Sequence, residues 1–206
     1  GLRPGMTVDA TLFHTDFSQI VIQTEAGRFI NAGSSVQSGI ELAGRVDFGT
    51  VFDTSHNVYL EGNYTGLYRA EFTNSQVVFD EEGEEVLETA SFDKGNRLPY
   101  APRHMLTIGV GYESPSRALD ARLALNHVSE QFVDAANTTE EADNGMEGRI
   151  DSYTLLSFSM NYRPTDRWVV SLAAQNLADR EFLMSRVDGM VAGRRRQLTG
   201  SVRFDF

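Results

Sequence analysis

Hydrophobic and polar residues alternate along most of this chain. In its last segment Leu198, Val202, Phe204 and Phe206 share one parity, while mainly polar residues occupy the other. Because successive side chains of a strand point to opposite faces, this pattern predicts a strand with one apolar and one polar face. The pattern recurs in eight segments and is less regular in the first and fifth, where we expect any β-bulge. The predicted strands span 6–16, 36–49, 57–70, 103–113, 119–132, 152–163, 167–176 and 194–206.

The connections between the predicted strands alternate between short and long. All five prolines lie in these connections or at the start of a strand. Short periplasmic turns and long extracellular loops are typical of outer-membrane barrels, whereas β-sandwiches mix connection lengths. The sequence therefore predicts an all-β fold, an antiparallel transmembrane β-barrel. The short connections span 50–56, 114–118 and 164–166, and the long ones span 17–35, 70–102, 133–151 and 177–193.

Aromatic residues on the apolar parity gather beside the short turns and the carboxy terminus. Residues at one height on the lipid-facing side of a barrel form an interfacial girdle. A sandwich core explains the burial of such residues but not their shared height. The predicted lipid-interface girdle consists of Phe48, Tyr112, Tyr162, Trp168 and Phe206.

Composition narrows the classes of function. Hydrophobic residues make up 41% of the 206, and no apolar run approaches the roughly 18 residues of a membrane helix. The absence of cysteine excludes disulfides, thiolate catalysis and cysteine-bound zinc. A net charge of -11 argues against a nucleic-acid partner.

The polar parity carries charges that face the lumen of the predicted barrel. A turn centred near Asp53 places Arg45 opposite Glu61, where the two side chains can pair. Two interpretations remain open: a salt-bridge ladder along the lumen wall, or a surface that touches a plug or a permeating solute. The inward set comprises Glu41, Arg45, Asp47, Glu61, Arg69, Arg203 and Asp205.

Two charge clusters lie in the long connections. The acidic run of Asp80, Glu81, Glu82, Glu84, Glu85 and Glu88 reads as a solvated loop, with a divalent-cation site as the alternative. The run 194–196 of three arginines reads either as an anchor to lipid phosphates or as an attractor for an anionic ligand, and Arg195 has the inward parity.

No recognisable chemistry nominates an enzyme. His14, His56, His104 and His127 are scattered without metal-ligand spacing, and no hydrolase elbow or phosphate loop occurs. The sequence therefore predicts neither catalytic residues nor a metal or cofactor.

Several segments resemble a known family. The run 176–182 (Asn-Leu-Ala-Asp-Arg-Glu-Phe), Gly193-Arg194 and the closing 202–206 resemble the end of TonB-dependent outer-membrane receptors. Segments 95–104, 129–132, 136–138 and 148–150 are similar to the ferric-dicitrate branch of that family.

The resemblance implies a 22-stranded barrel that is filled by an amino-terminal plug and takes up ferric chelates with energy from TonB. Residues 1–206 would form the carboxy-terminal part of that barrel, its last eight strands, as an open curved sheet. The plug domain, the energy-coupling segment and a signal peptide are not found in this sequence. The implied location is the bacterial outer membrane, and the implied partners are a ferric chelate, outer-membrane lipid, the TonB complex through the plug, and the barrel assembly machinery through Phe206.

The rival architecture is a complete eight-stranded barrel with a structural or adhesion role. Hydrogen bonds between the strand near Val8 and the strand near Val202 would favour it, whereas unpaired edges would favour a fragment. An outer-membrane hydrolase is a second rival; it needs a Ser–His pair at one height, which the predicted strands do not supply. For the receptor, we expect cations in the outer loops to gather a negatively charged ferric chelate. These candidates are Arg97, Arg149, Arg186, Arg194 and Arg195.

Overall fold

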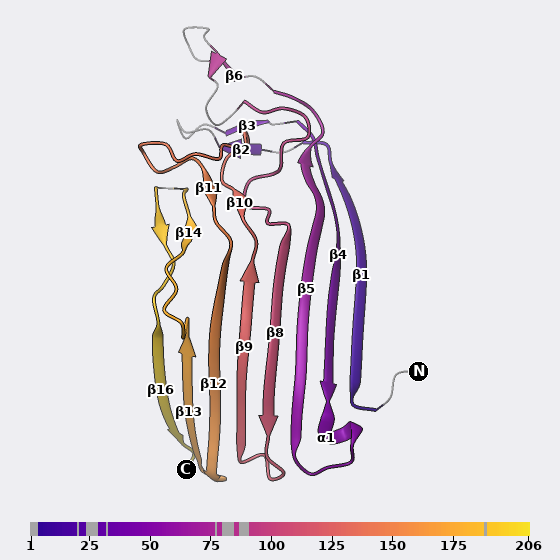
Figure 1. The fold of residues 1–206 in the computed structure, drawn as a ribbon, viewed down its shortest axis with the longest axis vertical. Coiled ribbons are helices and arrows are strands. Elements are labelled where there is room, and N and C mark those ends of the chain that lie inside the picture. The colour runs from indigo at the N-terminus through magenta and orange to yellow at the C-terminus, as the bar shows by residue number, and fades with distance from the viewer. Residues whose placement is uncertain are drawn as a thin grey trace.

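The computed structural model describes residues 4–19, 21–23, 29–31, 33–76, 78–79, 85–86, 91–187 and 189–206. Its main feature is one antiparallel sheet in which eight long strands follow one another in chain order, β1-β4-β5-β8-β9-β12-β13-β16 (Figure 1). These strands are β1 (Met6–Phe17), β4 (Ser35–Asp47), β5 (Asn57–Phe72), β8 (His104–Glu113), β9 (Leu119–Val128), β12 (Tyr153–Thr165), β13 (Trp168–Gln175) and β16 (Gln197–Phe204). The all-β prediction is confirmed.

Short strand pairs form within the long connections, which lie together at one end of the sheet, the loop end (Figure 1). The first short connection holds the helix α1 (Phe48–Val51) at the opposite end, the turn end. The short pairs are β2 (Val21–Gln23) with β3 (Phe29–Asn31), β6 (Val78–Phe79) with β7 (Glu85–Val86), β10 (Gln131–Phe132) with β11 (Arg149–Ile150), and β14 (Leu183–Ser185) with β15 (Val191–Ala192).

Three predicted strands were too long by two residues or more at one end or both. The eighth spans Gln197–Phe204 and not 194–206. The second ends at Asp47, so Phe48 belongs to α1 and not to a strand. The fifth ends at Val128, which lies opposite Tyr153, the first residue of β12; beyond it the Ser129 amide still donates to the His104 carbonyl (2.9 Å). The residues that follow pair separately, as β10 with β11.

A β-bulge in β5 corrects the predicted face of Arg69. Gly39 lies opposite Leu67, but Ser38 lies opposite Arg69, so Tyr68 is an extra residue. The extra residue reverses the alternation beyond it. Arg69 therefore shares the outward face of Ser38, and Ala70 turns inward and is buried. The pairings of β1 and β9 show no register shift, so the bulges expected there are absent.

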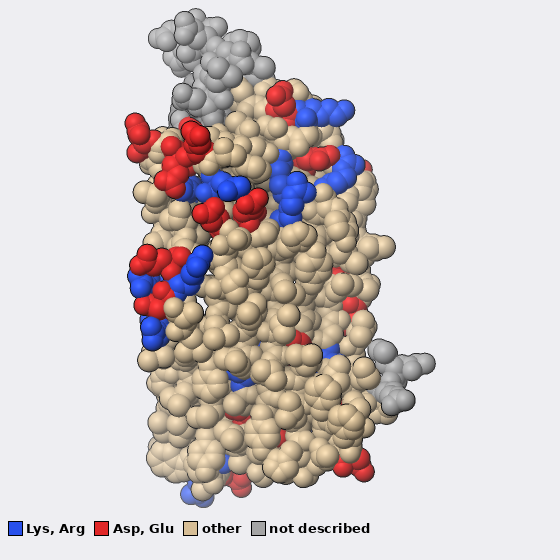
Figure 2. Space-filling view, in the orientation of Figure 1, with Lys and Arg blue, Asp and Glu red and all other residues tan. Residues whose placement is uncertain are grey.

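The sheet is open, as the sequence predicted. β1 and β16 each pair on one side only within the described residues. Outward leucines are more exposed on these edges, at 80% for Leu12 and 75% for Leu198, than in the interior, at 45% for Leu60 and 38% for Leu125. One broad face is almost free of charge along the strands, and charged side chains gather toward the loop end (Figure 2).

The buried core lies under the loops, because a single sheet has no second layer to pack against. Phe72 and Phe92 stack with ring centroids 3.8 Å apart, next to Ala135 and Leu98. Among the described residues, no helix is long and apolar enough to cross a membrane.

Candidate ligand-binding site

Asn176 fixes the loop that leads from β13 toward β16. Its backbone is left-handed (φ 49°), a conformation that Asn tolerates better than most residues. Its side-chain Nδ2 donates to the carbonyls of Arg180 (2.8 Å) and Arg194 (3.0 Å), and its Oδ1 accepts from the Arg180 amide (2.8 Å). One buried side chain thus joins both ends of this loop.

Asp179 holds the start of β16 in place. Its carboxylate accepts hydrogen bonds from Arg195 Nε (3.0 Å), Arg195 Nη2 (2.8 Å) and the Arg196 amide (2.9 Å). The bonds from Arg195, followed by the amide of Arg196, keep the pKa of Asp179 well below its usual range. Arg195 also contacts Glu181, so its charge is shared between two carboxylates.

Arg186 is a buried cation that joins three loops. Its Nη1 donates to the Gly145 carbonyl (3.2 Å), its Nη2 contacts Glu141, and its backbone amide donates to the Tyr100 hydroxyl (3.1 Å). The side chain is only 1% exposed. Its Nε has no hydrogen-bond acceptor within the described part of the chain.

A cavity of about 620 Å³ lies among these loops. Phe182 forms part of its lining and packs on Tyr153, with ring centroids 4.5 Å apart. The sheet register places Tyr153 on the same face as Glu61, so the cavity opens on the inward face at the loop end. The lining residues are Glu141, Arg149, Asp151, Ser152, Arg180, Glu181, Phe182, Leu183, Arg186, Ala192, Gly193 and Arg195.

Three of the five predicted arginines meet at this cavity, Arg149, Arg186 and Arg195. Arg149 contacts Glu130 (3.0 Å) and Asp151 (3.7 Å), and its buried Nε lacks an acceptor in the described part. All three therefore already have carboxylate partners.

Arg180 was missed as a site residue in the sequence. It is exposed, lines the cavity, and forms no ion pair with any described residue. Its position inside the asparagine-leucine segment was the available signal, but that segment was used only for the family resemblance.

Arg97 and Arg194 lie outside the cavity lining. Arg97 is 8% exposed and donates to the carbonyls of Ala101 (2.7 Å) and Leu67 (3.1 Å). Burial, with repulsion from Arg103, lowers the pKa of Arg97 to about 10. Arg97 thus organises its loop, and Arg194 remains exposed near the start of β16.

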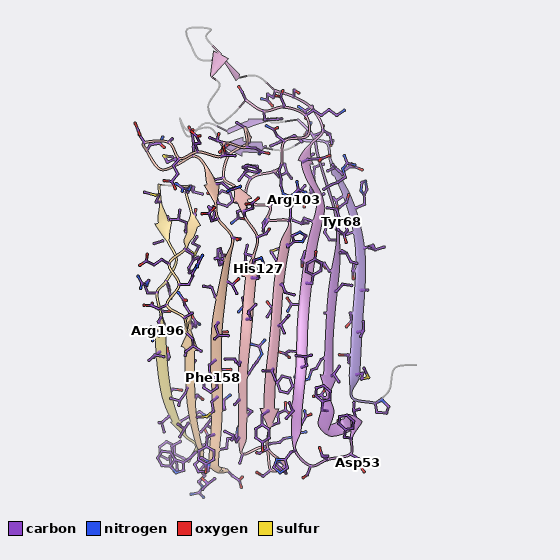
Figure 3. All side chains as sticks on the ribbon, in the orientation of Figure 1. Asp53, Tyr68, Arg103, His127, Phe158 and Arg196 are labelled. Carbon is purple, nitrogen blue, oxygen red and sulfur yellow. The ribbon has the colours of Figure 1, made fainter. Side chains whose placement is uncertain are left out.

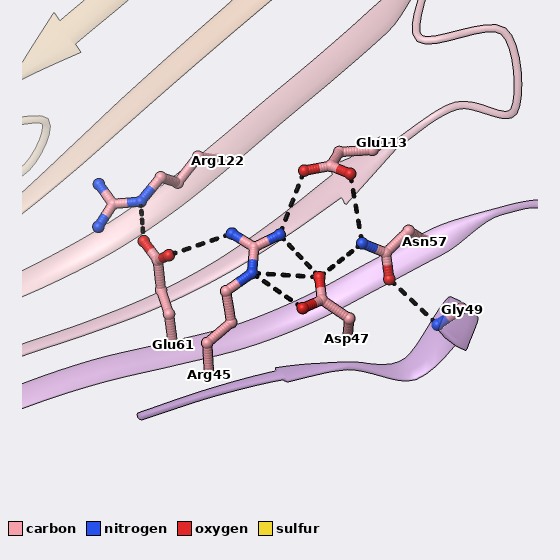
Figure 4. A network of polar contacts seen from close by, with 7 residues as sticks. All are labelled: Arg45, Asp47, Gly49, Asn57, Glu61, Glu113 and Arg122. Carbon is pink, nitrogen blue, oxygen red and sulfur yellow. Dashed lines mark hydrogen bonds and ion pairs between the residues drawn. The ribbon is translucent and has the colours of Figure 1, made fainter. Parts of the chain in front are cut away.

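A second polar cluster lies on the inward face near the turn end (Figure 4). The predicted pairing of Arg45 with Glu61 is confirmed, both in register and by an ion pair of 3.4 Å. The cluster extends further than the sequence indicated. Arg45 also contacts Asp47 (2.7 Å) and Glu113 (3.2 Å), and Glu61 contacts Arg122 (2.5 Å). These contacts tie together β4, β5, β8 and β9.

The predicted girdle residues lie near strand ends at the turn end: Phe48 begins α1, Tyr112 is next to the last residue of β8, Tyr162 lies in the last part of β12, and Trp168 begins β13. The carboxy terminus lies at the same end (Figure 1). Phe48 reaches this level from α1, where it stacks on Phe52 at 6.1 Å. Trp168 and Phe206 both pack on Phe204, at 4.8 and 5.1 Å. Their contact with lipid stays a prediction.

The structure does not test the divalent-cation site that was the alternative interpretation of the acidic run. The acidic run at 80–88 lies outside the residues whose side chains the structure describes, so both interpretations of it stay predictions. Among the described side chains, no group of three or more His, Asp or Glu residues is placed to hold a metal ion.

Comparison with known proteins identifies the family. The family described as TonB dependent receptor-like, beta-barrel matches residues 2–177. A curated relative, the pesticin receptor of Yersinia pestis, is 26% identical over 184 residues, which cover 86% of this chain and 23% of that protein. The chain therefore spans about a quarter of the length of this relative.

Solved structures show the same fold. The ferric citrate transporter FecA in its unliganded form superposes with a TM-score of 0.72 and 22% identity, covering 98% of this chain and 29% of that one. The ferric yersiniabactin uptake receptor FyuA from Yersinia pestis superposes with a TM-score of 0.71 and is 23% identical. The match covers 100% of this chain and 28% of that one. With the open sheet of alternating strands and the match over residues 2–177, these findings show that the chain belongs to the TonB-dependent receptor-like β-barrels of the bacterial outer membrane.

Proposed function

We propose that this chain is part of an outer-membrane receptor that takes up an anionic ferric chelate, with energy delivered by TonB. Family membership supports the receptor class, and the similar solved structures include transporters of ferric citrate and ferric yersiniabactin. The observation that carries the chelate proposal is the arginine-lined cavity on the inward face at the loop end. Ferric citrate is the specific candidate, because it is a small carboxylate-rich anion.

The cavity offers both charge and apolar contact. Arg180 has no ion pair among the described residues, and the Nε groups of Arg149 and Arg186 lack acceptors. Guanidinium groups bind carboxylates through strong charge-assisted hydrogen bonds. Phe182 and Leu183 add apolar surface to the same lining. An anionic chelate would therefore contact Arg180 first, while the paired arginines shape the site around it.

The inward face of the sheet fits a barrel that holds another domain. The Arg45–Glu61 cluster presents two guanidinium groups and three carboxylates to the lumen. A plug domain of the full-length receptor would pack on this polar wall, and the TonB complex would act through that plug.

The edges of the sheet favour a larger barrel over a closed eight-stranded one with a structural or adhesion role. Outward leucines on β1 and β16 lack the neighbours that cover interior strands, and unpaired edges are usually avoided in proteins. Further strands on both sides would cover them. The aromatic residues at the turn end would contact lipid. Phe206 would be recognised by the barrel assembly machinery.

The test is uptake by the full-length protein in a strain without other ferric citrate receptors. We expect transport of radiolabelled ferric citrate that requires TonB and falls at least tenfold in the Arg180→Ala variant. Arg194→Ala is the matched control, because Arg194 lies near the same loop but outside the cavity lining. Uptake of other ferric chelates but not citrate would contradict the citrate assignment. Uptake of citrate that is indifferent to Arg180→Ala would contradict the site.

A further inference from the structure

A row of imidazole–hydroxyl pairs crosses the outward face of the sheet near the loop end. His104 Nδ1 lies 2.8 Å from the Tyr64 hydroxyl, and His127 Nδ1 lies 2.9 Å from Thr154 Oγ1. On β1 and β4, His14 Nδ1 lies 2.7 Å from Ser38 Oγ, a Ser–His pair at one height that the predicted strands did not supply. Three histidines that are scattered in the sequence thus make the same kind of contact.

The register places these pairs on one face. Tyr64 lies opposite Leu106, Leu106 opposite His127, and His127 opposite Thr154, without a register shift. His104 lies two residues from Leu106 on the same strand and therefore shares its face. The row thus runs continuously across β5, β8, β9 and β12. His14 and Ser38 are directly paired on β1 and β4, but they lie nearer the loops, because the residue opposite Tyr64 on β4 is Leu42, four residues from Ser38.

The row lies at the loop-end border of the exposed apolar side chains on the outward face. His104 begins β8, and His127 is next to the last residue of β9. Both histidines therefore lie at the loop-side ends of their strands. Toward the turn end the same face carries exposed apolar side chains, among them Ile108, Val110 and Leu123. His127 accordingly lies nearer the loops than Phe158 (Figure 3).

The row offers imidazole nitrogens for hydrogen bonding at the loop-end border of this exposed apolar surface. Apart from the contact of His14 with Asp16, the second ring nitrogen of each imidazole has no partner within the described residues. Where Nδ1 accepts the proton of the hydroxyl, this second nitrogen carries the N–H, which is then available to an acceptor outside the protein. Phosphate offers several strong acceptor oxygens and no obligatory donor.

We propose that this row binds the phosphate groups of the glycolipid that forms the outer leaflet of the outer membrane. The long loops mark the outer side of such barrels, so the row faces the outer leaflet. The charged groups that face it are balanced: Asp16 pairs with His14, and Arg69, opposite Ser38, pairs with Glu71. The residues paired with His104 and His127 on this face include no carboxylate, so these two imidazoles are the main phosphate donors.

The full-length receptor, purified in detergent, tests this with defined lipids. Diphosphorylated lipid A is titrated against dephosphorylated lipid A, and bound lipid is counted by native mass spectrometry. We expect a preference for the phosphorylated form that falls at least tenfold in the double variant His104→Phe and His127→Phe, because the loss of one hydrogen bond to a charged group already accounts for about a tenfold change. His56→Phe is the matched control, because His56 makes the same contact with Tyr112 (2.7 Å) at the turn end.

A second double variant, which keeps hydrogen-bond donors at both positions, distinguishes loss of binding from loss of folding. His104→Arg with His127→Arg keeps donors at both places and adds charge, so this variant is expected to bind phosphorylated lipid A at least as tightly as the native protein. Equal binding of both lipids by the native protein, an unchanged preference in the Phe variant, or weakened binding in the Arg variant would each overturn the proposal. Equal affinity for phosphatidylglycerol would overturn the assignment to the glycolipid.

Discussion

The backbone amide of Arg186 donates a hydrogen bond to the hydroxyl of Tyr100, 86 residues earlier in the chain. The guanidinium of the same residue reaches Glu141 and the Gly145 carbonyl. Three long connections therefore converge on one buried residue, which also lines the cavity.

Arg186→Ala is expected to loosen these loops without unfolding the sheet. The substitution removes a buried cation and leaves the Gly145 carbonyl without its donor, a cost of about 1–3 kcal/mol. Hydrogen exchange on the full-length protein should show faster exchange near 141–145 and unchanged exchange in β8 and β9. Arg194→Ala, at an exposed position, should leave both regions as they are. Unchanged exchange near 141–145 in the Arg186 variant would show that other contacts hold the loops.

The ring of Phe182 occupies the space that a side chain at position 193 would fill, so this position requires glycine. A Cβ there would lie 2.1 Å from Phe182 Cζ, so Gly193→Ala must displace the ring from Tyr153. We expect a loss of about 1–3 kcal/mol in stability, as for other overpacked sites, and weaker ligand binding by the full-length receptor. Gly200→Ala is the control, because its Cβ would make an ordinary contact of 3.4 Å with Leu172. Thermal melts of both variants that coincide with the native melt would contradict this account.

The contact between Asp179 and Arg195 should resist acid. Because the bonds from Arg195 hold the pKa of Asp179 low in the folded protein, this carboxylate stabilises the fold at every pH above its ordinary range. That stabilisation is lost only as the pH falls below the ordinary range toward the lowered pKa. Exchange of the Arg196 amide, which donates to Asp179, should therefore stay protected through pH 4. Asp179→Asn should remove this dependence on pH, and loss of protection already at pH 5 would contradict it.

Alternation and turn position were sufficient to predict the sheet and one of its ion pairs. The turn centred near Asp53 correctly placed Arg45 opposite Glu61, because the register between the turn and this pair contains no β-bulge. Arg69 was placed on the wrong face, since the extra residue Tyr68 leaves no mark in the alternation itself. Burial of Arg97 depends on carbonyls brought close by loop folding, and a strand pattern carries no information about these contacts.

Arg45 is expected to contribute more to the stability of the fold than an arginine in a single exposed ion pair does. Its guanidinium contacts Asp47, Glu61 and Glu113 and lies 3.7 Å above the Tyr59 ring. Arg45→Ala would leave these carboxylates to repel one another with only Arg122 nearby. Because the side chain is 33% exposed, solvent screening limits the loss to about 1–2 kcal/mol.

Thermal melts of the full-length protein measure the loss for Arg45→Ala, and adding Glu61→Gln should restore part of it, because one repelling charge is removed. Arg163→Ala serves as the control. Arg163 also forms an ion pair, with Asp120 (2.8 Å), but its side chain is 45% exposed and contacts a single carboxylate. If the Arg45 and Arg163 variants melted at the same temperature, the cluster would be a set of independent surface pairs. If Glu61→Gln lowered the melting temperature of the Arg45 variant further, the remaining contact of Glu61 with Arg122 would outweigh the repulsion.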